Sequence, residues 1–152
     1  MSAALTPGLI LAIAVGGALG ALLRYGAQLL WPARGARVPI AVLLVNVVGS
    51  AIGGAFLALT QGNGFAAGAG VASGETHLVG PSLALIVVTG FCGGLTTFST
   101  FAVETVELAT SGSWRPAVAN IVLNVVLGLG AAALAFAATH AVVIATSGTF
   151  AG

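Results

Sequence analysis

The sequence contains very little charge: 5% of its 152 residues are Asp, Glu, Lys or Arg, and there is no lysine at all. A soluble domain carries about 25% charged residues, so this chain has too little polar surface to face water on every side. Four arginines and three glutamates give a formal charge of +1, which leaves no basic patch for nucleic acid. The mean hydropathy of +1.16 therefore predicts an integral, multi-pass membrane protein that is surrounded by the lipid bilayer.

Residues that carry chemistry are also scarce. The single cysteine, Cys92, excludes an intramolecular disulfide, and we expect it to fill space. His77 and His140 have no second ligand near them in the sequence, so they are poor candidates for a metal or catalytic site. The Gly-x-x-x-x-Gly-Lys phosphate-binding pattern is absent. A membrane enzyme needs convergent nucleophile, base or metal ligands, so we expect that this chain is not an enzyme.

What the sequence does contain is long apolar runs. Four of them span approximately residues 7–30, 38–59, 83–108 and 116–139. A membrane crossing needs roughly 20 apolar residues at about 1.5 Å each, and every run reaches that length. The sequence predicts an all-α fold, with residues 1–152 forming a single transmembrane domain of four helices.

The ends of these helices leave two questions open. The apolar run 141–145 could extend the fourth helix or lie at the membrane interface. Arg34, Arg37 and Arg115 fall in the two loops on one side, which by the positive-inside rule would place both termini outside the cytoplasm. A bias of three arginines is too small to fix the orientation.

The third apolar run contains the most informative stretch, residues 90–101. Three glycines in five residues predict that a helix breaks here, because glycine loses the most backbone freedom and adds no packing. Four hydroxyl residues follow, namely Thr96, Thr97, Ser99 and Thr100. In a membrane, unwound backbone is tolerated only where protein buries it or where it lines a polar cavity. The stretch therefore predicts a broken helix beside an ion or substrate site.

Other polar residues lie within the apolar runs. Arg24 could extend to the headgroups or face a water-filled vestibule that attracts an anion, and Glu104 could reach the same vestibule. Asn46 could join two helices or offer its amide to a dehydrated anion. Asn120 and Asn124 are four residues apart and share a helix face, where amides more often join helices than line a pore.

Two further patterns concern packing. Gly16 with Gly20, and Gly49 with Gly53, form small-xxx-small surfaces that let helices approach closely. Phe98 and its neighbour three residues on share a helix face, a spacing that by itself indicates core packing.

Three motifs in order carry a resemblance: Gly16-Gly-Ala-Leu-Gly-Ala-Leu-Leu-Arg-Tyr25, Val45-Asn-Val-Val-Gly-Ser50 and Gly93-Gly-Leu-Thr-Thr-Phe-Ser-Thr-Phe101. Together they resemble the Fluc/CrcB fluoride-channel family, across residues 15–138. The resemblance implies a small four-helix subunit that forms an antiparallel, dual-topology dimer with two fluoride pores. It also implies a passive, fluoride-selective channel that exports cytoplasmic fluoride and so protects against its toxicity.

The resemblance implies roles for individual residues as well. The pore phenylalanines would be Phe98 and Phe101, whose ring edges carry partial positive charge. Asn46 would supply a hydrogen bond, and hydroxyl donors would come from Thr97, Ser99 and Thr100. Asn124 is a further candidate pore residue. A structural sodium ion at the dimer interface would be held by the backbone carbonyls of Gly93 and Thr96.

The chain departs from the family's pattern where Asn120 and Asn124 stand in place of the usual Tyr and Ser. The arginine bias is a second departure, since a dual-topology protein should have balanced loops. The second subunit could therefore be an identical copy or an oppositely oriented paralogue. Two alternatives remain. A small multidrug-type proton-coupled exporter needs a carboxylate in its first helix, which this chain lacks. A purely structural subunit leaves the polar, broken helix unexplained.

Overall fold

The computed structural model describes residues 6–32, 38–61 and 81–149. Every element in these ranges is helical: α1 (Pro7–Leu30), α2 (Ile40–Gln61), α3 (Pro81–Ala84), η2 (Leu85–Cys92), α4 (Gly93–Leu95), α5 (Phe98–Thr110) and α6 (Trp114–Thr149). Four stretches are long and apolar enough to cross a membrane: Pro7–Leu30, Ile40–Thr60, Ser82–Thr110 and Trp114–Ala145. The expected all-α membrane fold with four long helices is confirmed.

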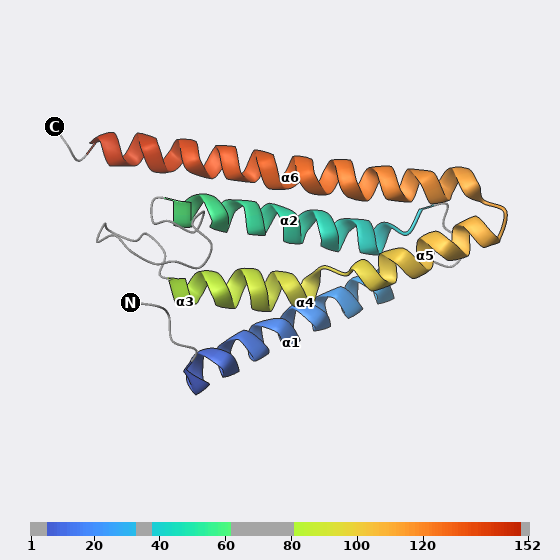
Figure 1. The fold of residues 1–152 in the computed structure, drawn as a ribbon, viewed down its shortest axis with the longest axis horizontal. Coiled ribbons are helices and arrows are strands. Elements are labelled where there is room, and N and C mark those ends of the chain that lie inside the picture. The colour runs from blue at the N-terminus through green and yellow to red at the C-terminus, as the bar shows by residue number, and fades with distance from the viewer. Residues whose placement is uncertain (1–5, 33–37, 62–80, 150–152) are drawn as a thin grey trace.

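The helices form one layered bundle (Figure 1). α6 packs along the length of α2, and α1 packs against η2 and α4, which make up the first half of the third span. α2 lies between α6 and this third span (Figure 1). Large apolar side chains such as Leu30 and Leu134 project from the outer surface, at 73% and 74% exposure. Lipid tails would solvate such a surface, so it is what a membrane subunit requires.

The fourth helix is longer than the expected 116–139. It begins at Trp114 and ends at Thr149, so residues 141–145 extend it. Its first helical hydrogen bond runs from the Ala117 N–H to the Ser113 carbonyl. Pro116 therefore lies in the first turn, where a missing N–H leaves no hydrogen bond unmade. Because 36 residues at about 1.5 Å each exceed the roughly 30 Å of a bilayer core, α6 is longer than one crossing needs.

Glycines bring α1 into backbone contact with the third span. A Cβ added at Gly94 would overlap the carbonyl oxygen of Gly17, and one at Gly20 would overlap that of Phe91. A Cβ at Gly90 would lie 2.6 Å from the Ile13 carbonyl oxygen. A Cβ at Gly16 would lie 3.1 Å from the Ile86 carbonyl oxygen, so the predicted close approach through Gly16 and Gly20 is confirmed.

On α2 the predicted pair of small residues is only half right. A Cβ at Gly49 would overlap the Thr96 methyl group, whereas one at Gly53 would meet no atom within 4 Å. The neighbouring Gly54 makes the close contact instead, with the backbone of Ala132 in α6. Gly49 faces the third span and Gly54 faces α6. Because these two partners lie on different faces of α2, the second close contact is one residue later than the four-residue spacing of Gly49 and Gly53 predicts.

The break lies within the expected stretch 90–101, but it falls after the three glycines and not at them. Gly90, Gly93 and Gly94 all lie in helical backbone, the first of them in the wider π-type turns of η2. The interruption follows at Thr96 and Thr97. Gly90 and Gly94 are retained in the helix because close packing on α1 replaces the side-chain contacts they lack. The helix ends where the Asn46 side chain replaces the helical hydrogen bonds of the Thr97 backbone.

Candidate functional site

The interruption in the third span is two residues of extended backbone. Thr96 has φ −76° and ψ 155°, and Thr97 has φ −149° and ψ 120°, which are ordinary values for β-type backbone. Thr97 then caps α5, because its hydroxyl oxygen accepts the Thr100 N–H at 3.2 Å. The sequence Thr-Thr-Phe-Ser-Thr thus ends one helix and begins another without positive φ angles.

Asn46 of α2 supplies the hydrogen bonds that the interrupted helix lacks. The Thr97 N–H donates to Asn46 Oδ1 at 2.8 Å, and Asn46 Nδ2 donates to the Thr97 carbonyl at 3.3 Å. One side-chain amide therefore pairs with both polar groups of one residue, as a neighbouring strand would. A membrane provides no water to satisfy such groups, so Asn46 makes the extended backbone tolerable at this depth.

From Asn46 a chain of hydrogen bonds crosses to α6 and returns to α5. Asn46 Nδ2 donates to Asn124 Oδ1 at 3.0 Å, and Asn124 Nδ2 donates to Asn120 Oδ1, also at 3.0 Å. Asn120 Nδ2 donates to Thr105 Oγ1 at 2.9 Å, and that hydroxyl donates to the Phe101 carbonyl at 2.6 Å. We call Asn46, Asn124, Asn120 and Thr105 the amide ladder.

The ladder brings together residues that the sequence suggested separately. Asn46 and Asn124 were candidate pore residues, and Asn120 was expected to join helices, which it does from a fully buried position. Thr105 was missed. A threonine that bonds the carbonyl four residues back in its own helix is common, so the sequence holds no signal that singles it out.

The candidate hydroxyl donors gather beside the break. Thr97 Oγ1 lies 3.3 Å from Ser99 Oγ and donates to Thr100 Oγ1 at 3.1 Å. Thr97 itself is buried, whereas Ser99 is exposed and Thr100 half-buried. The three hydroxyls form one cluster with an accessible side.

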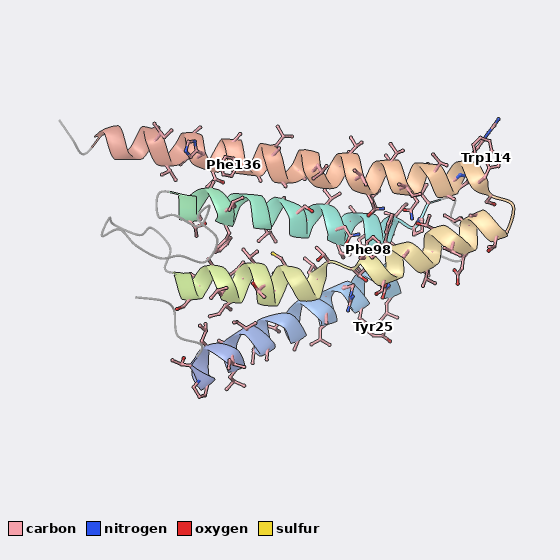
Figure 2. The ribbon with its side chains drawn as sticks, in the orientation of Figure 1. Tyr25, Phe98, Trp114 and Phe136 are labelled. Atoms are coloured by element: carbon pink, nitrogen blue, oxygen red, sulfur yellow. The ribbon has the colours of Figure 1, made fainter. Side chains whose placement is uncertain are left out.

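Phe98 and Phe101 form a pair on the same side of α5. Their ring centroids are 5.7 Å apart and the rings are tilted by 48°. Phe98 is 79% exposed on this subunit and lies at the start of α5 (Figure 2), while Phe101 is half-buried. A tilted pair presents ring edges, which carry partial positive charge, next to the hydroxyl cluster.

The two charged vestibule candidates are partly buried. Glu104 lies one turn after Phe101, and its Oε2 atom is buried with no hydrogen-bond partner among the described residues. Arg24 of α1 is half-buried. Within the described ranges the two side chains form no ion pair with each other, so the structure does not join them into one charged site.

Two backbone carbonyls at the break have lost their usual helical partners. In a helix the Thr97 N–H would bond the Gly93 carbonyl, but it donates to Asn46 instead. Likewise the Thr100 N–H would bond the Thr96 carbonyl, but it donates to the Thr97 hydroxyl. Gly93 is also exposed. Carbonyl oxygens are hard ligands that suit hard cations, so these residues fit the expected sodium site.

The remaining candidates do not join this site. His77 lies outside the described residues, and His140 stacks on Phe136 far along α6, with ring centroids 5.7 Å apart. The part of the chain that the structure describes holds no group of three His, Cys, Asp or Glu side chains able to bind a metal ion. Cys92 is buried, in keeping with a space-filling role.

Comparison with known proteins places this arrangement in a family. Residues 11–136 match the family described as CrcB-like protein, Camphor Resistance (CrcB). A protein of Saccharophagus degradans named fluoride-specific ion channel FluC is 38% identical over 133 residues, which cover 88% of this chain and 90% of that protein.

Two further relatives give the same result. Fluoride-specific ion channel FluC 1 of Yersinia pseudotuberculosis is 40% identical over 127 residues, covering 84% of this chain and 90% of that protein. FluC of Chromobacterium violaceum is 41% identical over 116 residues, covering 76% and 82% respectively. The helical bundle, the polar break and these similarities agree, and the chain belongs to the CrcB-like family.

Proposed function

We propose that this chain is a subunit of a passive, fluoride-selective ion channel of the inner membrane, and not an enzyme. Relatives with 38–40% identity over most of the chain are named as fluoride-specific channels. The observation that carries the proposal is the position of Phe98, which is 79% exposed beside a cluster of hydroxyls at the break in the third span. The pair that it forms with Phe101 presents ring edges to a polar surface, which is an arrangement suited to a small anion.

As fluoride passes the site, it exchanges its bound water for weak contacts with protein groups that are held in fixed positions. The edges of Phe98 and Phe101 offer partial positive charge, and the hydroxyls of Ser99 and Thr100 offer hydrogen bonds. Asn46 and Asn124 hold the backbone beside this path through hydrogen bonds of 2.8–3.3 Å. Since each contact is weak, the ion is released as readily as it is bound, which conduction requires.

Fluoride enters cells as the neutral weak acid HF, dissociates in the more alkaline cytoplasm and is trapped there as the anion. A selective passive channel lets the anion leave, driven by its gradient and by the negative interior. Export by this route protects the cell from fluoride toxicity and requires no nucleotide.

We further propose that two subunits pair in opposite orientations, either as two copies of this chain or with a paralogue. The exposure of Phe98 and Gly93 on the isolated subunit supports a second subunit on this surface. The carbonyls of Gly93 and Thr96 would hold a sodium ion between the subunits, where its positive charge would help to join them. Replacement of Na⁺ by N-methylglucamine should lower the thermal stability of the purified dimer. An unchanged melting temperature would contradict the sodium site.

The function is tested by fluoride efflux from liposomes that contain this purified chain alone, followed with a fluoride electrode beside a matched chloride measurement. Fast efflux of fluoride without chloride is expected, and it would show that a homodimer is sufficient. If folded protein gives no efflux, the chain is reconstituted with an oppositely oriented paralogue. Failure of that combination as well would overturn the channel proposal.

A further inference from the structure

α5 carries the aromatic pair and most of the hydroxyl cluster, yet it has little apolar packing of its own. No residue of α5 is buried in the subunit, whereas the preceding η2 and α4 contain the buried residues Gly90, Cys92 and Leu95. Two extended residues separate α5 from the packed half of the span. Apolar contacts alone therefore leave the orientation of α5 weakly determined.

Polar contacts hold α5 at two points. At its start, Asn46 of α2 pairs with the Thr97 backbone in both directions. Two turns later, Asn120 of α6 donates to Thr105 at 2.9 Å, and Thr105 donates to the Phe101 carbonyl. The first contact fixes where α5 begins, and the second fixes its rotation about that point.

Backbone groups decide which atom donates and which accepts in each hydrogen bond of the amide ladder. The Thr97 N–H can only donate, so the oxygen of the Asn46 amide must face it and the nitrogen must face Asn124. The Asn124 nitrogen then faces the preceding turn of its own helix, α6. There it donates to the Asn120 backbone carbonyl, which can only accept, at 3.0 Å. The Asn120 oxygen also accepts from Asn124, which leaves the Asn120 nitrogen to donate to Thr105.

We propose that Asn120 and Thr105 are positioning residues of the pore. Their hydrogen bond ties α5 to α6 and so sets the aim of Phe98 and Phe101, without either side chain contacting the ion. The proposal rests on the channel function proposed above. It assigns a purpose to the contact that the fully buried Asn120 makes between α6 and α5, namely the orientation of the aromatic pair.

The test compares single and paired substitutions of the two residues. Asn120→Leu and Thr105→Val each remove this hydrogen bond. Thr105→Val leaves Asn120 Nδ2 without its acceptor, whereas in Asn120→Leu the Thr105 hydroxyl keeps its bond to the Phe101 carbonyl. The double variant removes both partners, so it loses the tie but leaves neither side chain of this bond unpaired, a change that is nearly neutral for stability. Thr105→Ser keeps the hydroxyl. Thr110→Val is the matched control on the same helix, because that hydroxyl is exposed and bonds only carbonyls of α5.

Fluoride efflux should fall by roughly tenfold in both single variants, the upper range for loss of one hydrogen bond, with the dimer intact. Efflux should stay equally low in the double variant although its stability recovers relative to Thr105→Val. Thr105→Ser should conduct better than Thr105→Val, and Thr110→Val should match the wild type. Hydrogen–deuterium exchange should rise across α5 in Asn120→Leu and stay unchanged across η2.

Three results would overturn the proposal: wild-type efflux from folded Asn120→Leu, recovery of efflux in the double variant, or equal loss in Thr105→Ser and Thr105→Val. The first and third would show that the hydrogen bond is dispensable. The second would show that the two side chains only satisfy each other's hydrogen-bonding groups and do not orient α5. Absence of fluoride efflux from the wild type is a separate failure, that of the proposed function. The exchange measurement needs no fluoride and tests the tie even then.

Discussion

The two halves of the third span are held in different ways. The first half, η2 and α4, meets α1 through backbone contacts at Gly20, Gly90 and Gly94. The second half, α5, has no buried residue and is attached through hydrogen bonds to Asn46 and Asn120. Lipid is as apolar as leucine, so helices in a membrane associate through close van der Waals packing or through polar contacts. The third span uses close packing before its break and polar contacts after it.

The difference separates two tasks. Backbone packing is strong but carries no preferred chemistry, so it suits a scaffold that only has to stay in place. Hydrogen bonds have direction, and they aim a short helix without covering it. α5 therefore keeps Phe98 and Ser99 exposed.

The largest effect is expected from Gly94→Ala, in the packed half. The new Cβ would overlap the Gly17 carbonyl, and a backbone atom cannot move aside as a side chain can. We expect a loss of about 3 kcal/mol or more, at or beyond the upper end for overpacking, and little folded dimer by size-exclusion chromatography. Gly130→Ala in α6 is the control, since its Cβ meets no atom within 4 Å. Normal assembly of Gly94→Ala would show that the crossing can separate at no cost.

The next effect separates function from folding in the other half. Phe101→Ile and Phe98→Ile remove ring edges but keep apolar bulk, so we expect fluoride efflux to be abolished or strongly slowed while the dimer assembles normally. Phe136→Ile is the control, because this ring stacks on His140 in α6 and does not contact the break. Wild-type efflux from well-folded Phe101→Ile would refute the pore role of that residue.

The sequence predicted the scaffold better than the site. Four spans follow from composition, and the shared face of Asn120 and Asn124 follows from the helical period, because both signals are local. Their connection to Asn46 and Thr105 depends on how three helices pack, so no spacing in the sequence reveals it. Thr105 lies 15 residues before Asn120, and Asn46 lies 78 residues before Asn124.

The position of the break also depends on tertiary contacts. The three glycines predicted an interruption within residues 90–101, but the helix continues through them, with Gly90 and Gly94 packed on α1. The helix ends at Thr96 and Thr97, where Asn46 offers both a donor and an acceptor. Intrinsic propensity is a weak signal when a neighbouring helix supplies contacts.

A third prediction changes a polar contact of α5. Asn46→Asp can still accept the Thr97 N–H, but it loses both donors and turns a carboxylate towards the Thr97 and Asn124 oxygens. Repulsion between these oxygens and between the carboxylate and fluoride should block conduction, measured by efflux at a pH at which the carboxylate is ionised. Asn46→Leu removes the same hydrogen bonds without adding charge. If Asn46→Leu conducts partially and Asn46→Asp does not, the difference in efflux is due to the negative charge. Unchanged efflux in Asn46→Asp would remove Asn46 from the pathway.

The smallest effect is expected for Gly53→Ala on α2, where two adjacent glycines differ in what they face. Gly53→Ala adds a Cβ in open space within the subunit, whereas Gly54→Ala would overlap the Ala132 backbone. Alanine is favoured over glycine in a helix by about 1 kcal/mol, so Gly53→Ala should leave the melting temperature of the dimer unchanged or slightly raised, and Gly54→Ala should lower it. If Gly53→Ala instead weakens the dimer while the subunit stays helical, open space in one subunit must be filled by the other. Gly53 would then be a contact between subunits, and close glycine packing would extend from the scaffold to the assembly.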